Sequence, residues 1–204
     1  MFIEQIPNIL RLLYRRALWR GDKNEKVIYL TIDDGPTTLN TEWILDLLDK
    51  HGVKATFFCI GRNVEAHPEL YNMILEHGHK TGLHGYDHKR GLYSDTDAFY
   101  ADIEHASQFI KSNLFRPPHG NISPRQLREL SKRYTVVLWD VITRDYNRDL
   151  SGDDVLDIAI KYSRNGSIVV FHDSEKAMNN MRYALPKAIK HWIKEGYSFK
   201  LIKS

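Results

Sequence analysis

Short apolar runs alternate along the chain with longer segments in which apolar residues recur at helical spacing. Runs such as VIYL (27–30) and IVVF (168–171) are continuous, which is typical of strands buried on both faces of a sheet. Strands are predicted at 26–32, 54–61, 80–84, 114–118, 134–141, 167–173 and 197–202. Helices are predicted at 41–52, 67–78, 94–113, 123–133, 151–166 and 181–196. Ser94 or Asp95 is the expected cap of the third helix.

This order of elements favours one α/β domain with parallel strands and right-handed crossovers. An open doubly wound sheet and a closed barrel both satisfy the pattern. The barrel is favoured, because polar residues follow the carboxyl ends of several successive strands, where the active sites of barrels collect. The 204 residues suffice for one core, and no repeat or linker divides them.

Residues 1–25 are predicted to form a helical N-terminal extension, ahead of a catalytic domain at 26–204. The apolar positions of the extension that follow helical spacing are Ile6, Ile9, Leu10, Leu13 and Ala17. They predict a helix packed on the domain, and the alternative is a basic amphipathic helix that lies on a membrane surface.

Arginines interrupt the apolar stretch of this extension at Arg11, Arg15 and Arg16, so no cleaved signal peptide is expected. No other apolar run approaches the ~20 residues that span a bilayer. The predicted location is therefore cytoplasmic or peripheral at a membrane.

The composition is that of an ordinary soluble globular protein, with 42% hydrophobic residues, 27% charged residues and a net charge of +3. This balance predicts no nucleic-acid partner, and we expect a monomer. Cys59 is the single cysteine, so no intramolecular disulfide forms, and its apolar surroundings predict a buried thiol.

Two adjacent carboxylates, Asp33 and Asp34, follow the first predicted strand in TIDDGP. Their charges repel each other unless a cation or hydrogen-bond donors lie close by. His84 and His88 of HGYDH follow the third strand and are expected on the same rim. Two imidazoles and a carboxylate form a common ligand set of catalytic zinc, and of iron in some oxygenases. A simple turn and exposed loop histidines are the alternatives for each cluster alone.

Three further strand ends carry candidate residues. Arg116 in FRPPHG is placed to bind Asp33 through two parallel hydrogen bonds and to hold it ionised as a base. The fifth strand ends in LWDVITRDY, which offers Trp139, Asp140 and Asp145. His172 ends the sixth strand, where a neighbouring carboxylate would keep it protonated as a general acid.

In their order, these clusters resemble the motifs of the polysaccharide deacetylase family, also called NodB-homology or carbohydrate esterase family 4 proteins. TIDDGP is similar to TFDDGP, HGYDH to H-[S/T]-x-x-H, RPPHG to R-x-P-[Y/F]-G, WDVITRDY to the D-x-x-D-W region and IVVFHD to the L-x-H strand. The resemblance runs from about Lys26 to Ile202. It implies a deformed (β/α)7 barrel.

The resemblance also implies a metal-dependent hydrolase that removes N-acetyl groups from amino-sugar glycans such as chitin oligomers or peptidoglycan. The implied metal is Zn²⁺, with Co²⁺ or Ni²⁺ as alternatives. The positions that match the family's metal ligands are Asp34, His84 and His88. Asp33 would be the catalytic base, oriented by Arg116, and His172 the general acid, tuned by Asp145. The residues that would line the acetyl pocket are His119, Trp139 and Tyr146.

Three departures from the family pattern bear on the site. Gly85 stands where Ser or Thr supports the second metal histidine, which implies weaker support for metal binding. His119 replaces an aromatic residue whose backbone N–H the family uses at the oxyanion, and that amide is retained. Tyr146 replaces a Trp and alters the pocket wall.

Other functions stay open at this stage. The same site would serve an O-acetyl esterase acting on acetylated xylan or a similar glycan. A relative that binds glycan without cleaving it is the non-enzyme alternative, and the basic N-terminal segment fits a membrane-associated deacylase that acts on a lipid-linked sugar.

Overall fold

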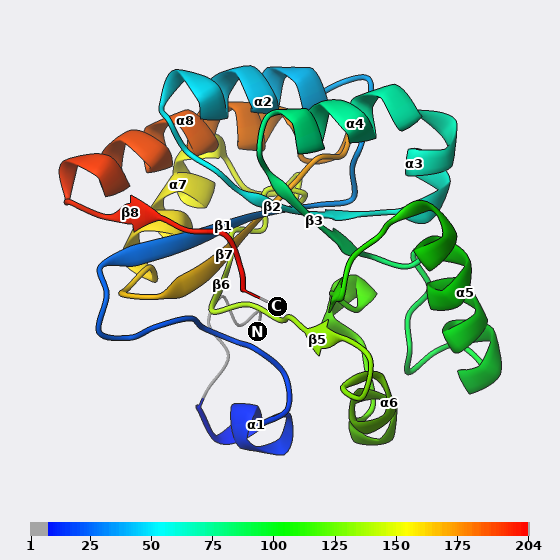
Figure 1. Ribbon diagram of the computed structural model, residues 1–204. Coiled ribbons are helices and arrows are strands. Elements are labelled where there is room, and N and C mark those ends of the chain that lie inside the picture. Colours follow the sequence, from blue (N-terminus) through cyan, green and yellow to red (C-terminus); the bar gives the residue numbers. More distant parts are fainter. Residues whose placement is uncertain (1–7, 204) are drawn as a thin grey trace.

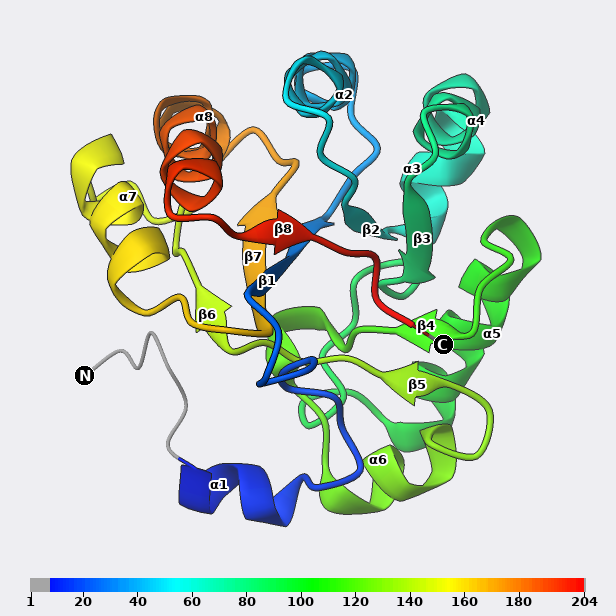
Figure 2. The same ribbon diagram turned by 60° about the vertical axis from the view of Figure 1, so that its left-hand side comes forward.

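Figure 1 shows the computed structural model, which describes residues 8–203 of the chain. One curled parallel sheet forms the centre, and helices cover its outer side (Figure 2). The strands are β1 (Val27–Asp33), β2 (Thr56–Cys59), β3 (Lys80–Leu83), β4 (Leu114–Phe115), β5 (Thr135–Val136), β6 (Val141–Ile142), β7 (Ser167–His172) and β8 (Ser198–Phe199). Their order around the sheet is β5-β4-β3-β2-β1-β7-β6, with β8 paired to β1 outside that path. The predicted α/β architecture is confirmed.

One segment joins the two edges of the sheet. β5 pairs with β4, whereas β6 pairs with β7, so the strand predicted at 134–141 is divided between both edges. In the interruption, the Val137 N–H donates to the carbonyl of Phe115 and the Asp140 N–H to the carbonyl of Ile168. The segment between β5 and β6 therefore bridges the two edges of the curled sheet through single backbone hydrogen bonds instead of a continuous strand.

The central strands are buried throughout, as their continuous apolar runs predict. Every residue of β1 and β7 is buried, and β1 pairs with both β2 and β7. Burial of each large apolar side chain contributes about 1.5–3 kcal/mol to stability. Cys59 is 0% exposed, which confirms the predicted buried thiol.

The helices agree with the periodicity apart from one addition. They are α1 (Asn8–Leu13), α2 (Thr41–Lys50), α3 (Gly61–Ala66), α4 (Pro68–Glu76), α5 (Thr96–Phe109), α6 (Pro124–Leu130), α7 (Gly152–Lys161) and α8 (Met178–Lys194). Asp95 caps α5 by accepting the backbone N–H groups of Asp97 and Ala98, as one of the two predicted caps. The short helix α3 was missed, because its six residues lack a repeating apolar face.

The N-terminal segment contacts the barrel differently from the prediction. Leu13 was expected on the packed face of a helix, but it is 68% exposed. Ala17, another predicted packed position, is 8% exposed and packs in the core, as expected. The segment is also held by an ion pair from Arg11 Nη2 to Asp140 Oδ1 at 2.7 Å and by backbone bridges at Leu18 and Arg20. Ile6 and the side chains of Ile9 and Leu10 lie outside the described part of the chain. No helix in the part of the chain that the structure describes is long and apolar enough to cross a membrane.

Candidate active site

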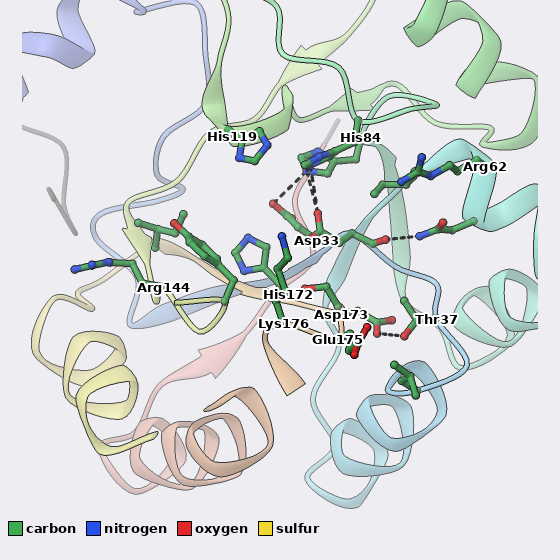
Figure 3. Close-up of a pocket in the computed structure, with 18 of the residues that line it drawn as sticks. Asp33, Thr37, Arg62, His84, His119, Arg144, His172, Asp173, Glu175 and Lys176 are labelled. Atoms are coloured by element: carbon green, nitrogen blue, oxygen red, sulfur yellow. Dashed lines mark hydrogen bonds and ion pairs between the residues drawn. The ribbon is translucent and has the colours of Figure 1, made fainter. Parts of the chain in front are cut away.

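The carboxyl ends of the parallel strands surround one pocket with a volume of about 750 Å³ (Figure 3). Eight of the predicted site residues line it, namely Asp33, Asp34, His84, His88, His119, Trp139, Tyr146 and His172. Arg116 and Asp145 do not line it but lie fully buried behind it. The five sequence clusters, spread over about 140 residues of chain, therefore meet at one rim because parallel strands end together.

Asp34, His84 and His88 form a group whose ligand atoms lie within 4.8 Å of one another. Asp34 Oδ1 lies 3.7 Å from His84 Nε2 and 3.4 Å from His88 Nε2, and the two Nε2 atoms are 3.2 Å apart. Two imidazoles and one carboxylate on one side leave the opposite side open toward the pocket, as in catalytic metal sites. The three residues fit a single divalent cation.

The protonation states of this group suit metal binding. His84 Nδ1 lies 2.8 Å from the carbonyl oxygen of Arg116, and donating a proton there leaves the Nε2 lone pair facing the group. Burial lowers the pKa of His84 to about 3, and burial followed by the neighbouring imidazoles lowers that of His88 to about 2. Both imidazoles are therefore neutral at pH 7. Burial raises the pKa of Asp34 to about 6, so protons compete with a cation for this carboxylate below that pH.

Three residues at the pocket, Asp34, His88 and His119, have left-handed backbone conformations. The φ angles are 77° at Asp34, 59° at His88 and 57° at His119. Such values at residues with a side chain cost about 1–3 kcal/mol each and persist only where the surroundings hold them. At Asp34 the carbonyl oxygen accepts a 2.8 Å hydrogen bond from Asn63 Nδ2.

The loop between the two histidines has support that the sequence prediction did not contain. Asp102 on α5 is 4% exposed and accepts the backbone N–H groups of Tyr86 and Asp87, each at 2.9 Å. Gly85 has φ of 75°, and a Cβ atom there would lie only 2.6 Å from Asp102 Oδ2. Glycine is therefore required beside this carboxylate. The weaker support for metal binding stays a prediction, although Asp102 holds the backbone of this loop from a distant helix.

Arg116 binds Asp33, but not through the two parallel hydrogen bonds that were predicted. Only Nη1 reaches Asp33 Oδ1, at 2.5 Å, and it also donates to Thr31 Oγ1 at 2.8 Å. Nη2 and Nε donate to the carbonyls of Leu138 and Val137, at 3.1 and 3.4 Å. Because the closing segment competes for its donors, the guanidinium holds both the carboxylate and the broken strand. Asp33 Oδ2 accepts no hydrogen bond from the described residues.

His172 is held from behind by Asp145. The ring Nδ1 lies 2.7 Å from Asp145 Oδ1, and the backbone N–H of His172 donates to Oδ2 at 2.8 Å. Burial alone would lower the pKa of His172, but the Asp145 carboxylate, followed by the charges of Asp34 and Asp33, raises the pKa to about 9. The imidazole is therefore protonated at neutral pH.

Three further residues form the wall. The Tyr146 ring meets His172 edge-on with centroids 4.9 Å apart, and the His119 ring lies 4.7 Å from that of His88. Trp139 packs on Gly120, where a Cβ atom would come within 2.6 Å of the indole ring. The backbone N–H of His119 has no backbone acceptor within residues 8–203.

Two aspartates differ from the sequence prediction. Asp173 was missed, although it directly follows His172 in the quoted motif. It is buried, lines the pocket, accepts hydrogen bonds from the hydroxyls of Thr37 and Thr41, and donates its N–H to the carbonyl of Asp33 at 2.7 Å. Asp140, offered as a rim candidate, does not line the pocket but binds Arg11 and Arg164.

Comparison with known proteins points to one family. A family model described as polysaccharide deacetylase matches residues 20–138. A peptidoglycan-N-acetylglucosamine deacetylase of Bacillus cereus is 32% identical over 190 residues, which cover 89% of this chain and 88% of the relative. The peptidoglycan-N-acetylmuramic acid deacetylase PdaA of Bacillus subtilis is 31% identical over 196 residues, 91% of this chain and 73% of that protein.

A solved structure agrees with these matches. The crystal structure of the Bc1960 peptidoglycan N-acetylglucosamine deacetylase superposes with a TM-score of 0.86 at 28% identity, covering 92% of this chain and 91% of the other. Some curated relatives are longer, and the chain spans 34% of the length of the Listeria monocytogenes deacetylase PgdA. The likeness to Bc1960 confirms the deformed (β/α)7 barrel.

Proposed function

Because the chain belongs to the polysaccharide deacetylase family, we propose that it is a metal-dependent hydrolase that removes N-acetyl groups from amino-sugar glycans of the peptidoglycan type. The relatives named above support this substrate, since they are peptidoglycan deacetylases. The observation that carries the proposal is the convergence on one pocket of a metal-binding triad, a carboxylate with a free oxygen and a protonated histidine.

Asp34, His84 and His88 would hold the metal, and Zn²⁺ is the proposed ion because two neutral imidazoles and a carboxylate suit it. When bound, such an ion lowers the pKa of water and polarises an acetyl carbonyl. The buried carbonyl of Arg116 would keep His84 in the tautomer that offers Nε2.

Asp33 is the proposed general base. Its Oδ1 is fixed by Arg116, so Oδ2 is the oxygen available to the pocket, 3.9 Å from His84 Nε2. A base in this position takes a proton from a water molecule beside the triad. The guanidinium fixes the orientation of the carboxylate.

His172 is the proposed general acid. Its Nδ1 is engaged by Asp145, so the proton available to substrate is the one on Nε2. Cleavage of a C–N bond requires that the departing amine be protonated, and a histidine with a pKa of about 9 carries that proton at neutral pH. The unpaired backbone N–H of His119 is a candidate donor to the oxygen that becomes negative during attack.

The experiment is an acetate-release assay on peptidoglycan fragments, chitin oligomers and acetylxylan. The purified protein would be stripped with a chelator and reloaded separately with zinc, cobalt or nickel. Release from the two N-acetylated substrates that disappears with the metal and returns on reloading is the expected result. Release from acetylxylan alone would instead identify an O-acetyl esterase, and a chain that binds metal but cleaves none of the three would contradict the enzyme assignment.

A further inference from the structure

The mouth of the pocket carries exposed positive side chains from separate elements. Arg62 comes from α3, Arg90 from the loop that follows the second metal histidine, and Lys176 from the loop that follows β7. Figure 3 shows Arg62 and Lys176 reaching the pocket from different elements. Glu175 is the one exposed carboxylate among the described lining residues. The mouth is therefore predominantly positive.

The carboxylates deeper in the site do not cancel this charge, because each has a partner of its own. Asp33 is bound to Arg116, and Asp145, behind the pocket, is bound to His172. Asp173 is held by the hydroxyl groups of two threonines. Asp34 belongs to the metal triad. The charges left to act on an incoming molecule are those at the mouth.

A fourth cation, Arg144, also lines the pocket but is half-buried. Two of the three exposed cations lack a carboxylate of their own. Arg62 Nη1 lies 3.9 Å from Asp87 Oδ1, and both side chains are about half exposed, so this pair is weak. Arg90 and Lys176 have no ion pair with any residue in the described range 8–203. Both line the same pocket, on two different loops.

We propose that Arg90 and Lys176 bind a carboxylate on the glycan, so that the site prefers an amino-sugar substrate that carries an acidic group close to the scissile N-acetyl. This inference rests on the deacetylase function proposed above. A guanidinium offers a planar pair of donors to a carboxylate, and an ammonium adds a point charge from the opposite loop. A neutral glycan such as a chitin oligomer engages neither charge.

The test compares two substrates that differ only in this group. One is an oligosaccharide that contains N-acetylmuramic acid, and the other is the same oligosaccharide after its lactyl carboxylate has been reduced to an alcohol. We expect the metal-loaded protein to favour the acidic form about tenfold in kcat/KM at low salt, and this preference to fall as ionic strength rises.

Substitutions of Arg90 and Lys176 test whether these two side chains cause the preference for the acidic substrate. Arg90→Gln and Lys176→Gln should each lower the ratio of acidic to neutral kcat/KM about threefold, and the double variant should bring it close to one. Lys190→Gln is the matched control, because Lys190 is an exposed lysine of α8 that does not line the pocket. That variant should keep the full ratio.

Calorimetry with the Asp33→Asn variant separates this inference from the proposed function. The acidic oligosaccharide should bind this variant more tightly than the reduced one, and adding the two glutamine substitutions should remove the difference. If neither substrate releases acetate, the deacetylase proposal is rejected, and the binding difference still decides the inference. Equal kcat/KM or equal binding for both forms, or a ratio that the glutamine variants leave unchanged, would overturn it.

Discussion

Asp33 and Asp140 are both buried aspartates beside arginines, and they lie next to opposite ends of β7. Asp33 is level with His172 at the carboxyl end of β7, whereas Asp140 binds Ser167 at the amino end. Neither is more than 2% exposed. Their sequence neighbourhoods made both of them candidates for chemistry.

The two carboxylates differ in how many of their oxygen atoms accept hydrogen bonds. Asp140 Oδ1 accepts from Arg11 and Arg164, at 2.7 and 2.8 Å, and Oδ2 accepts from Arg164 and Ser167, at 2.9 and 2.8 Å. Burial alone would raise its pKa, but these hydrogen bonds lower it to about 2. Asp33 has one oxygen bound and the other facing the pocket. A saturated carboxylate holds structure together, and a half-satisfied one retains an oxygen for a proton.

The largest effect should follow from Asp33→Asn. The amide keeps the shape but cannot accept a proton, so the rate of acetate release should fall by about 10²–10⁴-fold. Metal content, measured by mass spectrometry, should not change. Asp34→Asn is the matched variant and should instead empty the metal site. Undiminished turnover of Asp33→Asn would break the comparison at once.

The second effect should follow from Asp140→Asn and concerns stability. Breaking a fully buried ion pair costs about 3–5 kcal/mol, but the Arg164 side chain is 40% exposed, so a loss of about 2 kcal/mol is expected in urea unfolding. Activity per folded molecule should persist.

The pH dependence sharpens this prediction. The pKa of Asp140 is lowered in the folded state, so its contribution is present above the unfolded pKa of about 4 and is lost as pH falls toward 2. The wild-type chain should therefore lose stability over that range more steeply than Asp140→Asn. If the free energy of unfolding of the two proteins changed with pH in parallel, Asp140 would not be the saturated group described above.

A smaller effect should follow from Asp145→Asn, which tests a carboxylate bound by the ring and backbone N–H of His172 and by the backbone N–H of Tyr146. Without its negative charge, the pKa of His172 should drop from about 9, and the acid form would be lost at a lower pH. The alkaline limb of the pH–rate profile should move down by about one to two units. Tyr146→Phe keeps the ring beside His172 and should leave that limb in place. An unmoved limb in Asp145→Asn would argue against His172 as the acid.

The smallest effect should follow from Asp102→Asn. An amide has one oxygen to accept the N–H groups of Tyr86 and Asp87, so the loop between the metal histidines should loosen. Metal affinity, measured by competition with a chelator, should fall about tenfold. Asp97→Asn, at an exposed position of the same helix, is the control. An unchanged affinity would limit Asp102 to a purely structural role.

The amino-acid sequence determined the alternation of strands and helices and the placement of reactive residues at strand ends. Burial imposes a spacing of apolar residues that local patterns display directly, and parallel strands bring their carboxyl ends together. For this reason the placement of Asp33, Asp34, His84 and His172 at one rim could be predicted without a structure. Parallel strand order is enough to explain why these residues converge.

Only the tertiary structure decided how each group is satisfied. Arg116 binds Asp33 across 83 positions, Arg11 reaches Asp140 across 129, and Asp102 supports a loop that begins 17 residues before it. The different surroundings of Asp140 and Asp145, although both belong to the segment LWDVITRDY, also depended on distant partners. Hydrogen-bond saturation is a property of the folded surroundings, and no periodicity in the chain records it.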